Sequence, residues 1–179
     1  MFLNDNLKLF SGTANPELSN EVCNYLGIPV GGANLTKFPD GEKFIKLEDD
    51  VRGRDCFVLQ PTCEPVDEAV VELLIYIDCL RRASARRITA VVPYFGYARQ
   101  DRKDEGRVPI TAKLMANMIT TAGADRVVAV DLHAQQLQGF FDIPVDHLTA
   151  EIVLRNYFNE KKLENLTVVS PDVGNMKTA

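Results

Sequence analysis

The feature of this sequence that most constrains its fold is an alternation of short apolar runs with longer stretches of helical periodicity. The apolar runs predict strands at Leu7 to Ser11, Cys56 to Leu59, Ile88 to Val92, Val127 to Val130 and Leu166 to Val169. Strands that are apolar throughout are typical of a parallel sheet buried on both faces. We therefore predict an α/β fold, with a mostly parallel sheet covered by helices on both faces.

The stretches between these strands carry recognisable helix boundaries. Asn15 before Pro16 is typical of a helix N-cap followed by proline at the first helical position, and Gly27 is typical of a helix end. The later helices are predicted from the spacing of their apolar residues at Val66 to Ala83, Thr111 to Ala122 and Ala150 to Lys161.

One segment interrupts the regular alternation. Asn34 to Phe38 and Lys43 to Leu47 each alternate apolar with polar residues, and Pro39-Asp40-Gly41 between them is typical of a turn. We therefore expect an inserted antiparallel hairpin. Neither a repeat period nor a flexible linker is visible elsewhere in the chain.

The length of 179 residues suits one domain, or one domain with part of another. We expect an N-terminal α/β domain over residues 1–149, and the opening helix and strand of a truncated second α/β domain over residues 150–179. The last predicted strand is apolar throughout, yet the residues after it are too few to cover both of its faces. This favours a fragment of a longer parent protein; the alternative is an edge strand covered by a partner subunit.

Composition excludes several functional classes. With 25 acidic and 20 basic side chains the formal charge is -5, which disfavours a nucleic acid partner held by the overall field. No apolar stretch approaches the roughly 20 residues of a membrane span, and the start lacks a signal peptide, so we expect a cytoplasmic protein without a membrane partner. The four cysteines follow no zinc-binding spacing and are read as free thiols.

Polar residues follow three of the predicted strands. They are Pro93 to Asp104 after Val92, Asp131-Leu132-His133 after Val130, and Ser170-Pro171-Asp172 after Val169. Ligands of open α/β sheets bind outside the carboxyl ends of the strands, where helix N-termini present unpaired N–H groups. We expect these residues to meet at one edge of the sheet.

The loop from Pro93 to Val108 contains Arg99, Arg102, Lys103 and Arg107. Guanidinium groups match phosphate oxygens with two parallel hydrogen bonds, so the loop suits a polyphosphate. The alternative is a solvated charged loop without a ligand.

Asp131 and His133 lie on the same side of an extended segment and are candidates to hold a hydrated divalent cation. Imidazole is a poor ligand for magnesium, so contact through water or with a phosphate is equally compatible with the sequence. A structural hydrogen bond between the two side chains is the simpler alternative. Asp172 is a third candidate, with helix capping as its alternative role.

The turn Phe38-Pro39-Asp40-Gly41-Glu42 combines an aromatic ring with two carboxylates. Such a set can stack on a purine and accept hydrogen bonds from its amine or from ribose hydroxyls, although an ordinary hairpin turn has the same composition. The sequence contains neither a P-loop nor a Gly-x-Gly-x-x-Gly motif, which removes the main support for those two nucleotide folds.

Five motifs, taken together and in this order, resemble the ribose-phosphate diphosphokinase family, also called phosphoribosyl pyrophosphate synthetases. The motifs extend over almost the whole chain and are Lys37-Phe38-Pro39-Asp40-Gly41-Glu42, Pro93-Tyr94-Phe95-Gly96-Tyr97-Ala98-Arg99-Gln100-Asp101, Asp131-Leu132-His133-Ala134, Gln138-Gly139-Phe140-Phe141-Asp142-Ile143-Pro144-Val145-Asp146 and Ser170-Pro171-Asp172. Each motif alone is weak evidence, and the set is specific.

The resemblance implies a phosphoribosyltransferase-like fold and a transferase of nucleotide biosynthesis. The family moves the diphosphoryl group of ATP to ribose 5-phosphate with magnesium as cofactor, and self-association into dimers and hexamers is implied. Carried over by position, the nucleotide-binding residues are Phe38, Asp40, Gly41, Glu42, Arg99, Gln100 and Asp104, the hairpin residues acting on a neighbouring subunit. The metal-binding residues are His133, Asp172 and Asp131.

No catalytic residue is assigned, because the family's catalytic loop and ribose-phosphate loop would follow Ala179. We therefore expect the 179-residue chain to be inactive alone. Two other functions share the fold and stay open at this point: a noncatalytic homologue that binds nucleotide and regulates active subunits by co-assembly, and a phosphoribosyltransferase, whose ribose-phosphate signature is missing from this sequence.

Overall fold

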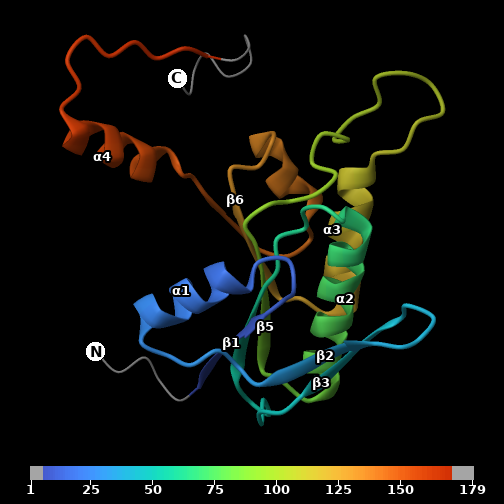
Figure 1. Ribbon diagram of the computed structural model, residues 1–179. Coiled ribbons are helices and arrows are strands. Elements are labelled where there is room, and N and C mark those ends of the chain that lie inside the picture. The colour runs from blue at the N-terminus through green and yellow to red at the C-terminus, as the bar shows by residue number, and fades with distance from the viewer. Residues whose placement is uncertain (1–5, 171–179) are drawn as a thin grey trace. The chain divides into compact units, whose positions relative to one another are not determined.

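The computed structural model describes residues 6–170 (Figure 1). It divides into two compact units, Met1–Leu148 and Thr149–Ala179, and each is described here by itself. Within the described residues, no helix combines the length and the apolar character that a membrane span requires.

The first unit is built on a five-stranded sheet in which every neighbouring pair of strands is parallel. In spatial order the strands are β1 (Leu7–Ser11), β4 (Asp55–Leu59), β5 (Arg87–Val92), β6 (Arg126–Val130) and β7 (Val145–Leu148). The predicted mostly parallel α/β sheet is thereby confirmed. Because all five strands run in one direction, the loops that follow them start from a single edge of the sheet.

Helices cover both faces of the sheet: α1 (Pro16–Leu26) lies on one side, and α2 (Val66–Arg82) and α3 (Thr111–Ala122) lie on the other (Figure 1). The alternation of side chains along β1 shows the two faces. Leu9 packs in a small cluster with Cys23 of α1, whereas the ring of Phe10 lies 5.9 Å from that of Tyr76 on α2. The second face holds the larger core.

The ends of α1 follow from local chemistry. The side chain of Asn15 accepts a hydrogen bond from the N–H of Leu18 at 3.0 Å, and Pro16 occupies the first position of the helix. Gly27 ends the helix in the left-handed conformation with φ of 68°. The predicted bounds of α3 are also those of the structure.

The inserted hairpin consists of β2 (Ala33–Lys37) and β3 (Lys43–Leu47), paired antiparallel as predicted. It forms a separate two-stranded sheet that packs on α2 through the buried side chain of Ile45. The turn is closed by the N–H of Phe38, which donates to the carbonyl of Glu42 at 2.8 Å. Gly41 has φ of 93°, a conformation that favours glycine there.

Two sequence-based expectations were wrong after β6. β7 forms where no strand was predicted, because its apolar pattern is interrupted by Asp146 and His147 and only its pairing with β6 identifies it as a strand. Leu166 to Val169 forms no strand; the segment is largely exposed and pairs with no strand in residues 6–170. An apolar run becomes a strand only when a neighbouring strand completes its backbone hydrogen bonds.

The second unit contains α4 (Glu151–Lys161), close to its predicted range. The hydroxyl of Thr149 accepts a hydrogen bond from the N–H of Glu151, the first residue of the helix, at 3.2 Å. The apolar residues of α4, among them Val153 and Tyr157, are exposed. The idea that this unit opens a second α/β domain stays a prediction.

The core between the sheet and α2 is expected to dominate the stability of the first unit. Leu73 is fully buried in this core, so Leu73→Ala should lower the free energy of unfolding by about 2–5 kcal/mol. Val71 on the same helix is 48% exposed, and Val71→Ala should change it by no more than about 0.5 kcal/mol. Urea unfolding of both variants measures the difference; equal losses would show that α2 does not face the core as described.

Candidate nucleotide and metal site

A cavity of about 430 Å³ opens at the carboxyl edge of the sheet, beyond the ends of β5 and β6. It is lined by Val66 of α2, by residues 94–100 and by residues 130–133. The cavity therefore brings together four of the residues predicted for the site from two separate motifs: Arg99, Gln100, Asp131 and His133.

Thr62, in the loop after β4, holds the loop after β5 that carries Arg99. The Thr62 hydroxyl donates to the carbonyl of Tyr94 at 2.9 Å and accepts the N–H of Gly96 at 2.7 Å. A side chain at position 96 would lie 2.6 Å from the Thr62 carbonyl, so this approach needs glycine. Thr62 was not identified from the sequence; its signal is a polar residue three positions after the end of an apolar strand.

The same loop is tied to two helices. Gln100 accepts a hydrogen bond from the hydroxyl of Thr111, the first residue of α3, at 2.5 Å. The hydroxyl of Tyr97 donates a hydrogen bond to the carboxylate of Asp67 in the first turn of α2. This hydrogen bond, together with desolvation, raises the pKa of Tyr97, so the phenol stays protonated over a wide pH range. The side chain of Arg99 is exposed, while the loop that carries it is held by hydrogen bonds to Thr62, Asp67 and Thr111.

The turn that carries Asp131 and His133 is held by β7. The N–H of Asp131 donates to the carbonyl of Leu148 at 3.0 Å, and the N–H of Leu132 donates to Nε2 of His147 at 3.0 Å. Asp131 has φ of 44°, in the left-handed region that is uncommon for residues other than glycine. His147 was not predicted to support this turn, because the strand to which it belongs was missed.

The donor set at this turn suits a magnesium ion that arrives bound to phosphate. It consists of one carboxylate, Asp131, and one imidazole, His133, and both side chains are exposed. Residues 6–170 contain no group of three or more metal-binding side chains. Magnesium commonly keeps several waters and is held by one or two carboxylates together with substrate phosphates, which this set can accommodate. Asp172, the third predicted ligand, lies outside the described residues.

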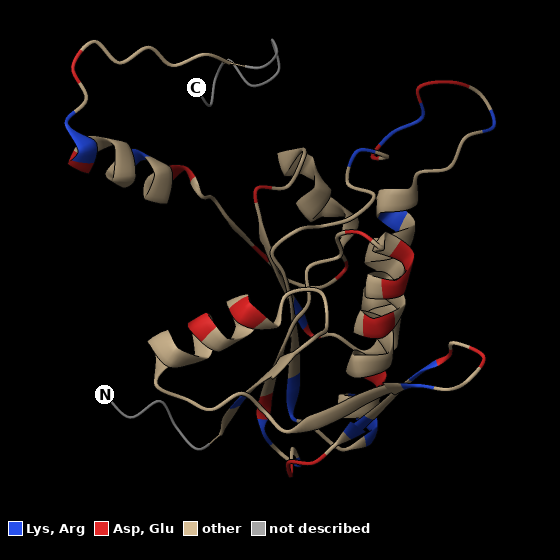
Figure 2. Ribbon diagram, in the orientation of Figure 1, with Lys and Arg blue, Asp and Glu red and all other residues tan. Residues whose placement is uncertain are grey.

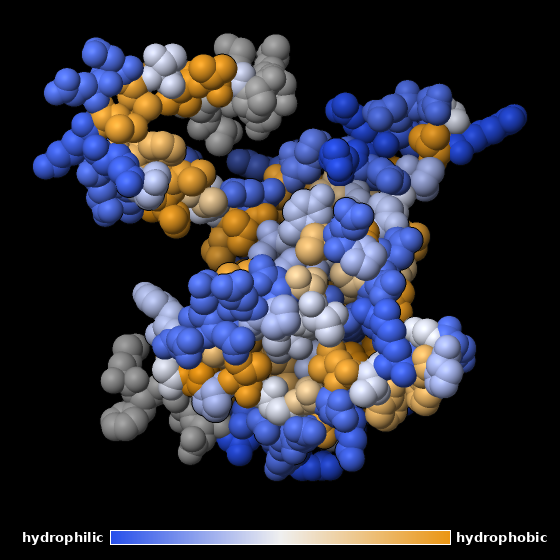
Figure 3. All heavy atoms as spheres, viewed as in Figure 1, coloured by the Kyte–Doolittle hydropathy of each residue, from blue (hydrophilic) through white to orange (hydrophobic). Residues whose placement is uncertain are grey.

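The remaining predicted residues do not line this cavity. Phe38, Asp40, Gly41 and Glu42 form the exposed tip of the hairpin. Asp104 lies in the charged loop before α3 and accepts a hydrogen bond from Arg102 at 3.0 Å, with both side chains more than three quarters exposed. This loop forms a mostly hydrophilic part of the surface (Figure 3).

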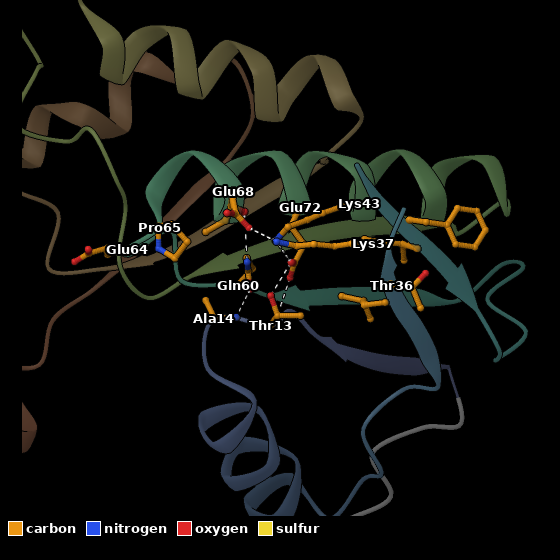
Figure 4. A pocket seen from close by; sticks show the side chains of 14 residues that line it. Thr13, Ala14, Thr36, Lys37, Lys43, Gln60, Glu64, Pro65, Glu68 and Glu72 are labelled. Atoms are coloured by element: carbon orange, nitrogen blue, oxygen red, sulfur yellow. Dashed lines mark hydrogen bonds and ion pairs between the residues drawn. The ribbon is translucent and has the colours of Figure 1, made fainter. Parts of the chain in front are cut away.

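A second cavity, of about 440 Å³, was not expected from the sequence. It lies between the hairpin, the loop after β1 and the N-terminal half of α2 (Figure 4). Its most buried charged side chain is Glu72, only 2% exposed. Glu72 accepts hydrogen bonds from the N–H of Thr13 at 2.6 Å, from the Thr13 hydroxyl at 2.7 Å and from Nζ of Lys43 at 2.5 Å. The available signal was a glutamate within the apolar face of the predicted helix.

Comparison with known proteins agrees with the motifs. Residues 7–123 match the family described as the N-terminal domain of ribose phosphate pyrophosphokinase. Ribose-phosphate pyrophosphokinase from Rhodopirellula baltica is 59% identical over 175 residues, which are 97% of this chain and 55% of that protein. The Bacillus subtilis protein of the same name is 53% identical over 174 residues, again 97% of this chain and 55% of that protein.

A solved structure shows the same relationship. The crystal structure of phosphoribosylpyrophosphate synthetase from Mycobacterium smegmatis matches with a TM-score of 0.85 and 49% identity, over 87% of this chain and 52% of that one. The chain thus spans about half the length of the relatives that it matches. Since the family match alone covers more than half of the chain, this protein belongs to the ribose-phosphate pyrophosphokinase family.

Proposed function

We propose that the protein acts as a ribose-phosphate diphosphokinase, which transfers the β,γ-diphosphoryl group of ATP to the anomeric hydroxyl of ribose 5-phosphate. The products are phosphoribosyl pyrophosphate and AMP. The observation that carries this proposal is the convergence of Arg99, Gln100, Asp131 and His133 on one cavity, in a chain of this family. The half of its relatives that this chain does not match would supply the ribose 5-phosphate site.

In this reaction the anomeric oxygen forms a bond to the β-phosphorus while the bond from that phosphorus to the α,β-bridging oxygen breaks. AMP leaves with the electron pair, and the hydroxyl proton is lost. Such transfer depends mainly on positioning and on neutralising phosphate charge. Arg99 is suited to hold phosphate oxygens with its guanidinium group, and Gln100, fixed by Thr111, is suited to orient the nucleotide beside it.

Magnesium is the proposed cofactor, bound as the ATP complex. When bound, it would neutralise part of the polyphosphate charge, with Asp131 and His133 holding it directly or through water. The hydrogen bond from Leu132 to His147 ties the backbone between these two side chains to β7. Asp172 remains a proposed third ligand.

The hairpin tip is proposed to bind adenine and ribose on a neighbouring copy of the chain. Phe38, Asp40, Gly41 and Glu42 are exposed and line neither cavity of their own copy, which favours action on another copy. A complete nucleotide site would then need self-association into dimers, with hexamers as the proposed larger assembly. Asp104 is proposed as a further nucleotide contact, and location in the cytoplasm remains a prediction.

The complete gene product is expected to release AMP from ATP only when ribose 5-phosphate is present, and the 179-residue chain is expected not to. A coupled assay of AMP formation measures both. ATP binding without AMP release by the complete product would favour the noncatalytic homologue. Use of phosphoribosyl pyrophosphate with a nitrogenous base, in place of ATP, would instead indicate a phosphoribosyltransferase.

Arg99→Ala should weaken binding of Mg-ATP by about ten-fold to a few hundred-fold, because it removes one or two charge-assisted hydrogen bonds. Lys103→Ala, an exposed cation of the same loop, is the matched control and should bind as the parent does. Calorimetric titration of the complete product decides between them. The free energy of unfolding of both variants should stay within about 0.5 kcal/mol of the parent. Unchanged affinity in Arg99→Ala would favour the solvated-loop alternative.

Mixing two variants that are each impaired in nucleotide binding tests the shared site. In a mixed oligomer of Phe38→Ala and Arg99→Ala, about a quarter of the sites should combine an intact hairpin with an intact cavity under random assembly. Activity should therefore rise well above that of either variant alone. If the hairpin served its own copy, every subunit would carry one lesion, and the mixture would show only the average of the two variants.

A further inference from the structure

The neck of the hairpin carries two like charges in direct opposition. Lys37, the last residue of β2, is paired with Lys43, the first residue of β3, in the register of the two strands. Like charges at directly opposite positions destabilise an antiparallel pair. The five residues between them form the tip that carries the proposed nucleotide contacts. Figure 2 shows this arrangement, with basic residues at the neck, where the two strands end, and acidic residues at the tip.

Helix α2 supplies the opposite charges. Glu68 and Glu72 are one turn apart and so lie on the same face of the helix. Nζ of Lys37 lies 2.7 Å from Glu68, and Nζ of Lys43 lies 3.8 Å from Glu68 and 2.5 Å from Glu72. The hydrogen bond from Lys37 lowers the pKa of Glu68, which keeps its carboxylate ionised. Both lysines of the neck therefore reach Glu68, and Lys43 also reaches Glu72 (Figure 4).

The two contacts differ in environment. Lys37 and Glu68 are each about half exposed, and a surface pair of this kind contributes little. Lys43 and Glu72 are only 13% and 2% exposed, so removing one partner leaves a charge that water cannot solvate well. Glu72 is also held by two hydrogen bonds from Thr13, which join the loop after β1 to the same point.

The cavity beside this pair is not proposed as a ligand site. The side chain of Gln60 at its floor accepts the N–H of Ala14 at 3.2 Å and donates to the carbonyl of Ala69 at 3.4 Å. Glu72 has three donors. These buried polar groups thus hold the hairpin, α2 and the loop after β1 together, and they offer no unpartnered group to a ligand.

The hairpin needs such support. An isolated two-stranded hairpin is only marginally stable in water, and β2 and β3 share no ladder with the main sheet. The hairpin is held on α2 by the packing of Ile45 and its neighbours and by a hydrogen bond from Sγ of Cys79 to the Ile45 carbonyl at 3.9 Å. The ion pairs of Lys43 add contacts at the neck, close to the tip.

We propose that Lys43 and Glu72 are positioning residues that lock the neck of the hairpin to α2 and thereby hold Phe38, Asp40 and Glu42 in the orientation that binds the nucleotide. The part of this inference that concerns nucleotide rests on the proposed function. The locking itself does not, and the two parts are tested by different measurements.

Amide hydrogen exchange of the complete gene product tests the locking. In Lys43→Met, exchange of the hairpin amides over residues 33–47 should accelerate by roughly ten-fold to a hundred-fold, since a nearly buried carboxylate loses its cation. Exchange in β4 and β5 should be unchanged. Lys46→Met removes the same charge from an exposed position on the same strand and should leave the hairpin as in the parent.

A double-mutant cycle assigns the effect to the pair. Glu72→Gln keeps groups that can bond Thr13 but removes the charge, and the double variant Lys43→Met/Glu72→Gln should exchange no faster than the faster single variant. Additive effects, acceleration equal to that of Lys46→Met, or equal acceleration in β4 and β5 would each overturn the locking.

Steady-state kinetics tests the positioning. Lys43→Met should raise KM for ATP by about ten-fold and leave KM for ribose 5-phosphate and kcat within about two-fold. A KM for ATP equal to the parent's, or a parallel rise of both KM values, would overturn the positioning role. If the complete product proves inactive, the proposed function fails, while the exchange measurements still decide whether the hairpin is locked.

Discussion

The single direction of the strands is the constraint on which the rest of this structure depends. Parallel strands cannot be joined by tight turns, so the chain crosses the molecule between strands and returns to the same starting edge each time. Every strand consequently ends at the opposite edge, where the next loop begins. This is why Arg99 and Gln100 after β5 share a cavity with Asp131 and His133 after β6. The position of the site is therefore set by the topology of the sheet, whichever side chains the loops carry.

Buried and half-buried polar side chains then determine the shape of the loops at that edge. A buried donor or acceptor without a partner costs roughly 1–3 kcal/mol, so loops settle where such groups are satisfied. Thr62 joins the loops after β4 and β5, and His147 of β7 holds the turn after β6. Glu72 does the same for the hairpin and the loop after β1. None of these three residues belongs to the predicted nucleotide or metal sets.

Features with local sequence signals were predicted, and features that depend on contacts between distant segments were missed. Helices α1 and α3 and the hairpin could be predicted because their signals are local: a cap, periodicity and a turn. The residues of the cavity could be predicted because strand ends have a known position in this fold class. β7 was missed and Leu166 to Val169 was predicted wrongly, since a strand also requires a partner that apolar content does not reveal.

The contacts of Thr62, Glu72 and His147 could not be predicted, because each joins segments far apart in the sequence.

The first turns of α2 connect the two regions for which nucleotide binding is proposed. Asp67 accepts a hydrogen bond from the hydroxyl of Tyr97, in the loop that carries Arg99. Glu68, the next residue, accepts a hydrogen bond from the ammonium group of Lys37, in the hairpin. Neighbouring residues of a helix point about 100° apart, so one turn can hold one loop on each side. With 17 residues and a core face that includes Leu73, Tyr76, Ile77 and Leu80, α2 is anchored along its length. A rigid helix is therefore the common support of both regions, and their spacing within one copy is set by its packing on the sheet.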